Sequence, residues 1–185
     1  MIFARRFIAL LALIGFAAYA ASNTVDFATL NVVGDVEWRF DEGMAEAGPQ
    51  KAIGYLVSTD KYSDFRLTIE FWIEDDTNSG IFLRCIDAET ISADACYEAN
   101  IWDNHPNQES RTGSIVKHVK PQAHVETIGE WNTYDIEVRG NTVQLLVNET
   151  LTATLQDDRL KTGYVALQYG GKGRLRFRNL EITPL

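Results

Sequence analysis

The chain has 185 residues and a formal net charge of −9 at pH 7, because 26 Asp and Glu outnumber 17 Lys and Arg. This acidic balance argues against nucleic acid and anionic membrane surfaces as partners, since both require a basic patch. It is compatible with a neutral sugar or a cation as ligand, and equally with charge that serves solubility alone.

The first 21 residues have the pattern of a secretory signal peptide. Arg5 and Arg6 supply a basic start, residues 7–16 form an apolar run, and residues 18–20 have the small-residue pattern of a cleavage site. An uncleaved anchor helix is the alternative, but the run is shorter than the ~20 residues that span a bilayer. The sequence therefore predicts a signal peptide over residues 1–21, and a secreted or periplasmic mature chain that is not held at a membrane.

Residues 22–185 have the length of one domain with a full core, and no Pro-rich linker divides them. Residues 65–73 show the clearest pattern, because apolar and polar side chains alternate there with the period of two that a strand requires. Many short strands with turn residues between them predict an all-β domain, built as a two-sheet antiparallel β-sandwich. The strands are expected, in chain order, at residues 36–40, near 44, and at 54–58, 65–73, 80–86, 97–102, 114–119, 134–139, 142–147, 151–155, 163–168 and 174–182.

The segment from residue 96 to residue 103 is the most informative stretch of the chain. Side chains in a strand alternate between the two faces of the sheet, so this strand has one apolar face and one polar face. The polar face suits recognition of a hydroxylated ligand such as a sugar better than it suits a core. It carries Cys96, Glu98, Asn100 and Trp102, and Asp103 ends the strand.

Cys85 and Cys96 are the only cysteines, and an even pair in an exported chain predicts a disulfide. The alternative, a pair of zinc ligands, lacks further Cys or His at zinc spacing. No metal and no cofactor is expected. If the two cysteines stand opposite each other in a regular ladder, Arg84 lies on the other face from Glu98, whereas a shift of one residue would bring the two together. The sequence leaves this register open.

Several motifs in order resemble the family of 3-keto-disaccharide hydrolase domains, also called DUF1080. The resemblance covers most of residues 22–185 and implies a concanavalin A-like jelly roll. Two positions depart from the usual pattern: Asn100 stands where Gln is usual, and Gly170 stands where many members have His. The motifs are Trp38–Gly43, Tyr62–Leu67, Asn78-Ser79-Gly80-Ile81-Phe82-Leu83-Arg84, Tyr97–Asp103, Thr112–Ile115, Trp131-Asn132, Leu167-Gln168 and Phe177–Leu180.

The resemblance implies a ligand site on a concave sheet and action on glycosides oxidised to a ketone at C3. Such chemistry needs a base for the hydrogen on C2, a proton donor for the leaving oxygen, and a hydrogen-bond donor or cation at the ketone. Two functions are therefore carried forward: a hydrolase or lyase of 3-keto-glycosides, and a non-catalytic carbohydrate-binding module or lectin. A structural or interaction domain of the cell envelope is a third alternative.

Glu98 is the first candidate for the catalytic base, and an ion pair with Arg84 is its alternative role. His105 is the candidate acid, against the alternative of a surface His in a loop. Trp102 is a candidate for stacking on a sugar ring, and Trp72, on the polar side of its strand, is a second one. The expected substrate-binding residues, each of which has a purely structural alternative, are Arg84, Asn100, Trp102, Asp103, Lys117 and Gln168.

Overall fold

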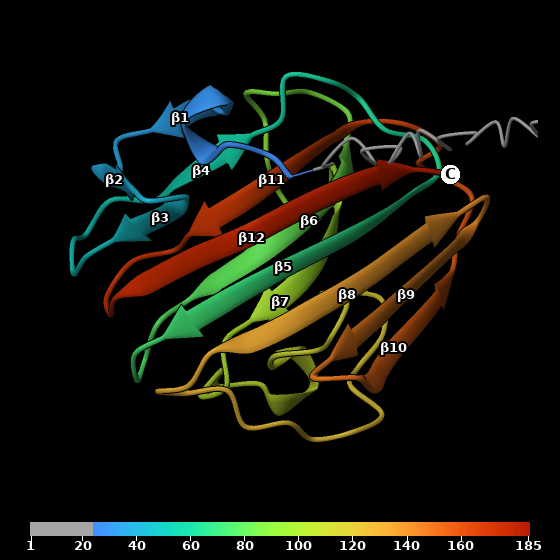
Figure 1. The fold of residues 1–185 in the computed structure, drawn as a ribbon. Coiled ribbons are helices and arrows are strands. Elements are labelled where there is room, and N and C mark those ends of the chain that lie inside the picture. The colour runs from blue at the N-terminus through green and yellow to red at the C-terminus, as the bar shows by residue number, and fades with distance from the viewer. Residues whose placement is uncertain (1–23) are drawn as a thin grey trace, which may run out of the picture.

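The computed structural model describes residues 24–185, so the predicted signal peptide lies outside the described residues. The described chain forms twelve strands and two short 3-10 helices, arranged as two antiparallel sheets (Figure 1). The predicted all-β, two-sheet sandwich is thereby confirmed. The five-stranded sheet has the order β1 (Asn31–Gly34), β4 (Gly54–Val57), β11 (Tyr164–Tyr169), β6 (Ser79–Cys85), β7 (Tyr97–Ile101). The seven-stranded sheet has the order β10 (Thr150–Gln156), β9 (Thr142–Val147), β8 (Asn132–Arg139), β5 (Phe65–Ile73), β12 (Leu175–Pro184), β3 (Met44–Ala47), β2 (Trp38–Asp41).

The core lies between the two sheets and follows from the alternation read in the sequence. In β5 every second side chain, from Phe65 to Ile73, is buried in the main core cluster. The inward side chains of β7, Tyr97, Ala99 and Ile101, meet them from the other sheet. Burying one face of each sheet removes a large apolar area from water, which is the main favourable contribution to folding.

The outer face of the seven-stranded sheet is covered by ion pairs between neighbouring strands. Arg176 of β12 bonds Glu46 of β3 at 2.6 Å, and Arg178 of β12 bonds Glu70 of β5 at 2.6 Å. Trp72 is on this face, where the Arg176 guanidinium lies 4.9 Å from its ring centroid. Trp72 therefore makes a cation–π contact on the opposite side of the sandwich from Glu98, and the stacking role considered for it has no support here.

The predicted strand over residues 114–119 is not a regular strand. Ile115 instead makes single bridges to Ala99 of β7 and to Val119. Val116 donates its N–H to the carbonyl of Glu98 at 3.0 Å, so this segment runs along the free edge of β7. An edge strand exposes unpaired backbone groups, and the long connection from β7 to β8 satisfies them here. This connection also holds the 3-10 helix η2 (Gln108–Ser110).

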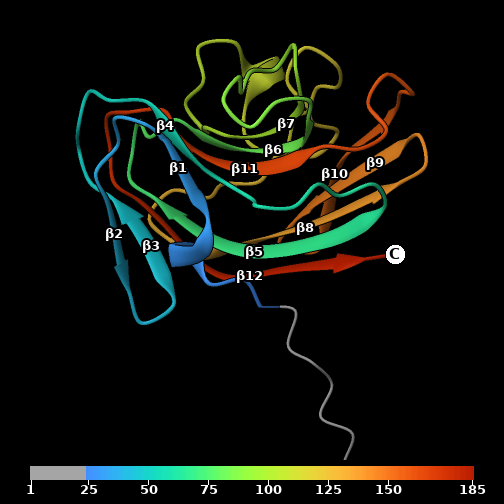
Figure 2. The same ribbon diagram turned by 90° about the horizontal axis from the view of Figure 1, so that it is seen from above.

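Both sheets bend in the same direction, and the five-stranded sheet is on the inner side of the bend (Figure 2). The segments that follow β6 and β7 lie over its outer face.

The Cys85–Cys96 disulfide confirms the predicted pairing. It lies in a second, small cluster of buried side chains, against which Ile91 of the β6–β7 connection packs. No helix within residues 24–185 is long and apolar enough to cross a membrane.

Candidate functional site

The outer face of the five-stranded sheet collects polar side chains from three strands, β4, β7 and β11. Glu98 of β7 stands opposite Phe82 of β6, and Gln168 of β11 stands opposite Gly80 of β6 on one side and Tyr55 of β4 on the other. Residues opposed in a ladder share a face, and so do residues two apart in a strand. Glu98 and Gln168 therefore lie on the same face, away from the main core.

Glu98 is the unusual group on this face. Its side chain is half-buried, and its carboxylate has no hydrogen bond or ion pair with any residue in 24–185. Burial raises the pKa of Glu98 to about 7, and the positive charge of Lys117 opposes this rise. Burial disfavours the charged form of a carboxyl group, which is why its pKa rises. Glu98 can therefore both accept and release a proton near neutral pH.

Gly80 makes room for this carboxyl group. A Cβ at position 80 would lie 3.2 Å from Oε1 and 3.4 Å from Cγ of Glu98. The Glu98 side chain thus leans across β6 towards β11, which carries Gln168. A glycine inside a strand often marks such a close approach, and here it connects the glycine of the Asn78-Ser79-Gly80 motif with the position of the candidate base.

Gln168 presents an unused amide oxygen. Its side chain is 8% exposed, its Nε2 donates to the Tyr55 hydroxyl at 3.4 Å, and its Oε1 is buried without a partner among the described residues. The Tyr55 hydroxyl donates in turn to the carbonyl of Ile91 at 3.4 Å. A buried acceptor without a donor costs about 1–3 kcal/mol, and a ligand hydroxyl would remove that cost.

Asn78 and Tyr55 are polar residues of this face that the sequence analysis did not single out. Asn78 precedes β6 and is two residues before Gly80, so strand periodicity alone would have placed it on this face. Its amide makes no hydrogen bond within residues 24–185 and is half-buried. It also explains Gly170: a Cβ there would collide with the Asn78 amide, so a His at this position would require Asn78 to move.

Arg84 was expected to bind substrate, but its side chain is buried among protein groups instead. It is 1% exposed, and its guanidinium bonds the carbonyls of Ser63, Gly140 and Leu160 and, at 3.0 Å, the carboxylate of Asp64. Those five hydrogen bonds use all five N–H donors of an arginine. Arg84 is therefore neither the partner of Glu98 nor available to a ligand; it joins three connections at one end of the sandwich.

A bulge in β6 is the reason that Arg84 points away from Glu98. Ala166 pairs with Phe82, yet Tyr164, two residues earlier in β11, pairs with Cys85, three residues later in β6, so β6 has an extra residue at this point relative to β11. Arg84 has a φ of 52°, in the left-handed region that side chains rarely adopt. The one-residue shift that the sequence left open does exist, but it pairs Phe82 with Glu98 and turns Arg84 away.

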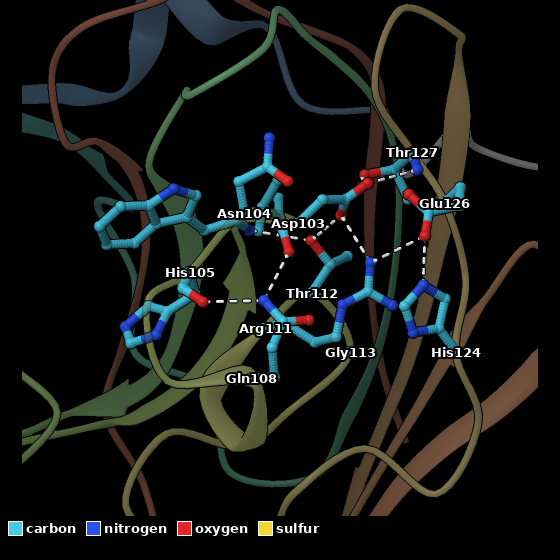
Figure 3. Close-up of polar contacts among 12 residues, drawn as sticks. Asp103, Asn104, His105, Gln108, Arg111, Thr112, Gly113, His124, Glu126 and Thr127 are labelled. Atoms are coloured by element: carbon cyan, nitrogen blue, oxygen red, sulfur yellow. Dashed lines mark hydrogen bonds and ion pairs between the residues drawn. The ribbon is translucent and has the colours of Figure 1, made fainter.

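Asp103 also has a structural environment (Figure 3). It is 3% exposed, and its carboxylate accepts bonds from the Thr112 hydroxyl at 2.5 Å and from Thr127 N and Oγ1 at 2.6 and 2.8 Å. The Arg111 guanidinium lies 3.9 Å away and also contacts Glu126 at 3.5 Å. This network holds both ends of the β7–β8 connection, and it leaves Asp103 no free oxygen to bind a ligand.

Asn100 fixes the same connection from within β7. Its side-chain amide bonds the carbonyl of Ser110, and its backbone carbonyl accepts the Tyr134 hydroxyl at 2.8 Å and Gly113 N at 3.2 Å. Asn100 is 2% exposed. It lies on the same face as Glu98, as predicted, but its side-chain N–H already has a protein partner.

Trp102 and His105 contact each other beyond the end of β7, with ring centroids 4.6 Å apart. His105 Nδ1 accepts from the backbone N–H of Asn107 at 3.0 Å, and none of its hydrogen bonds reaches Glu98. Lys117 is exposed and bonds both oxygens of Asp94 at 2.8 Å. Of these three residues, only Lys117 has an electrostatic effect on Glu98.

The arrangement can hydrogen-bond a ligand that carries hydroxyl groups. It offers a carboxyl group that titrates near neutral pH, two side-chain amides and a tyrosine hydroxyl, and amides have both the donors and the acceptors that sugar hydroxyls match. Among residues 24–185, no three His, Cys, Asp or Glu side chains are placed to hold a metal ion. The site residues brought together are Tyr55, Asn78, Gly80, Phe82, Glu98 and Gln168.

Comparison with solved structures supports the jelly-roll fold. A protein of Parabacteroides distasonis described as a candidate glycosyl hydrolase has a TM-score of 0.68 and 21% identity, over 82% of this chain and 93% of that one. A carbohydrate-binding module from Bacillus subtilis has a TM-score of 0.62 and 13% identity, over 84% and 97%. The exoplasmic/lumenal domain of VIP36, solved with Ca²⁺ and Man3GlcNAc, has a TM-score of 0.62 and 7% identity, over 86% of each chain.

No curated protein matches the chain. Residues 22–183, however, match the model of one family along nearly the whole described chain, as the motifs from Trp38 to Leu180 led us to expect. The chain therefore belongs to the 3-keto-alpha-glucoside-1,2-lyase-like domain family.

Proposed function

We propose that the outer face of the five-stranded sheet binds a glycoside oxidised at C3 and that Glu98 is the acid–base group that cleaves it. The observation that carries this proposal is the half-buried, unpartnered carboxyl group with a pKa of about 7, which lies on the same face as the orphaned amide oxygen of Gln168. A general base works best when its pKa is near the operating pH. The name of the family, which describes a lyase acting across C1 and C2 of a 3-keto-glucoside, supports the same chemistry.

The ketone at C3 makes the hydrogen on C2 acidic. In the proposed reaction Glu98 takes that proton, the electron pair of the C2–H bond forms a C1=C2 double bond, and the bond from C1 to the leaving oxygen breaks. Glu98 then returns the proton to the leaving oxygen, so that charge and atoms balance. Addition of water to the double bond would complete a net hydrolysis. The Asn78 amide is a free N–H donor on the same face, and we assign it to the ketone oxygen.

A single catalytic group is proposed because the other candidates have structural partners. His105 contacts Trp102 and Asn107, while Arg84 and Asp103 are saturated by protein groups. The same observation favours the second candidate function, a carbohydrate-binding module that does not cleave its ligand. Likeness in fold to a carbohydrate-binding module is compatible with this second function.

One experiment separates the two functions. The protein is incubated with a 3-keto-disaccharide and with its unoxidised parent, and both binding and release of free sugar are measured. Catalysis by Glu98 predicts release from the keto compound only, and Glu98→Gln should abolish release while leaving binding within a few-fold of wild type. Binding without release by the wild type would support the module. Release that survives in Glu98→Gln would refute the role of Glu98 while leaving the substrate class intact.

We also propose that the mature chain is exported. The Cys85–Cys96 disulfide supports this, since disulfides persist mainly in oxidising compartments. Expression of the full chain in a bacterium, followed by mass spectrometry of the periplasmic fraction, should show a product that begins after residue 20 or 21. An intact N-terminus in the membrane fraction would contradict it.

A further inference from the structure

A mainly apolar cavity of about 480 Å³ adjoins the proposed site at the end of β11. Its wall includes Pro49, Ile53, Gly170 and Gly171. Gly170 connects the cavity wall with the proposed site, because it lies two residues beyond Gln168 and its N–H donates to the carbonyl of Asn78 at 2.8 Å. The cavity therefore lies next to the end of the face that carries Gln168 and the Asn78 amide.

The register of β4 places Ile53 on the same face of the sheet as Tyr55 and Gln168. Tyr55 stands opposite Gln168 and Gly54 stands opposite Tyr169, so Ile53, the residue before β4, comes next to Gly170. Ile53 is two residues from Tyr55, and strand periodicity gives these two side chains the same face. Ile53 is 55% exposed, although it is a large apolar residue beside a polar site.

The walls of the cavity are held in place by one buried hydroxyl group. The Tyr169 hydroxyl accepts from the N–H of Gln50 at 3.2 Å, and its single hydrogen is shared between the carbonyls of Gly48 and Gly173, each 3.0 Å away. These bonds join the segment that contains Pro49 to the loop that follows Gly170. A preformed cavity binds a ligand with a smaller loss of conformational freedom than one that must be ordered on binding.

The lining decides which chemical group fits. Pro49, Ile53 and two glycines contribute apolar surface. The polar residues of the wall are Gln50, whose side-chain amide bonds the backbone of Glu37, Lys172, which bonds Asp76 at 2.8 Å, and Lys51. The wall contains no aromatic ring and no carboxyl group for a second sugar ring. A cavity of about 150 Å³ already holds a benzene ring, so this one has room for an aryl or alkyl group.

We propose that this cavity receives the apolar aglycone of a glycoside whose sugar ring lies on the Glu98 face. The substrate class would then be alkyl or aryl glycosides rather than disaccharides. This inference rests on the proposed function, because it takes the Glu98 face as the sugar site. In the proposed elimination the aglycone is the group that leaves from C1, and the cavity would orient its oxygen at the end of the face.

The test compares methyl and phenyl 3-keto-glucosides by calorimetry on Glu98→Gln, which should bind without cleaving, and on two matched variants made in that background. The phenyl compound should bind at least tenfold more tightly than the methyl compound. Ile53→Asn should remove most of that gain and leave the methyl compound unchanged. Ile86→Asn is the control, because Ile86 is 60% exposed and lies after β6, outside the cavity wall; it should change neither affinity.

Each other outcome has a distinct meaning. Equal affinity for the methyl and phenyl compounds, or an equal loss for both in Ile53→Asn, overturns the aglycone site and leaves the sugar site standing. A 3-keto-disaccharide that binds more tightly than the phenyl compound, in a manner that depends on Ile53, assigns the cavity to a second sugar ring and also overturns the inference. No binding of either glucoside by Glu98→Gln, together with no release of sugar from either by the wild type, would refute the proposed function itself.

Discussion

Replacing Glu98 by Gln tests the electrostatic basis of the site without any ligand. Gln has nearly the same shape as Glu but no charge, so it should remove the penalty of holding an ionised carboxylate in a half-buried position. Glu98 has no compensating hydrogen bond or ion pair within residues 24–185. The variant should therefore be more stable than the wild type at any pH where the carboxyl group of the unfolded wild type is ionised, even though it should lose the proposed catalysis.

The size and pH range of the effect follow from the pKa of Glu98. Burial raises this pKa from 4.5 to about 7, and one pKa unit is worth about 1.4 kcal/mol, so the full penalty is about 3 kcal/mol. Below pH 4.5 the group is protonated in both the folded and the unfolded state and contributes nothing. As the pH rises from about 4.5 to 7, only the unfolded state ionises freely, so the wild type loses stability and the variant does not.

The assay is urea unfolding of both proteins between pH 4 and pH 8.5, followed by tryptophan fluorescence. The variant should gain about 2–3 kcal/mol in the free energy of unfolding at pH 8 and nothing at pH 4. Glu89→Gln, an exposed change in the β6–β7 connection, is the control and should show no such difference. A constant difference between Glu98→Gln and the wild type at every pH would show that the Glu98 carboxyl group is not desolvated, and the reasoning for its role would fail.

Three further predictions concern the groups around the site. Arg84→Met should lower the free energy of unfolding by about 3 kcal/mol or more, because Asp64 and three carbonyls lose their donors; an unchanged urea midpoint would contradict this. Removing the disulfide by Cys85→Ala with Cys96→Ala should cost about 2–3 kcal/mol, and dithiothreitol should shift the thermal midpoint of the wild type but not of this variant. Gly80→Val should displace the Glu98 carboxyl group and weaken sugar binding at least tenfold in calorimetry, with the circular dichroism of the fold retained; wild-type affinity would refute the close approach.

Strand periodicity allowed much of the fold and part of the site to be read from the chain. It predicted the long strand β5, the two-sheet sandwich, and a shared face for Glu98 and Asn100 on β7. The disulfide followed from a count of two cysteines in a chain with a predicted export signal. These inferences succeed because alternation and cysteine count are local properties, which do not depend on which strands become neighbours.

The role of each polar residue was not readable in the same way. Asp103 lies in the same motif as Glu98, and Arg84 ends the motif that begins at Asn78. The bulge in β6 nevertheless turns Arg84 into the end of the sandwich, and Thr112 and Thr127 saturate Asp103. A bulge is not visible in a residue pattern, because it depends on the register with the neighbouring strands. The sequence therefore named more ligand-binding candidates than the structure leaves free.

The amino-acid sequence by itself determined the strands, the disulfide and the face on which Glu98 lies, because each of these depends on spacing along the chain. Only the tertiary structure decided that β11 lies between β4 and β6, which brings Tyr55, Gln168 and Asn78 to that face and leaves a cavity beside Gly170. The physical reason is that burial and hydrogen-bond satisfaction are properties of neighbours in space. A carboxyl group titrates near pH 7 here because of what surrounds it, and no single stretch of the chain contains those surroundings.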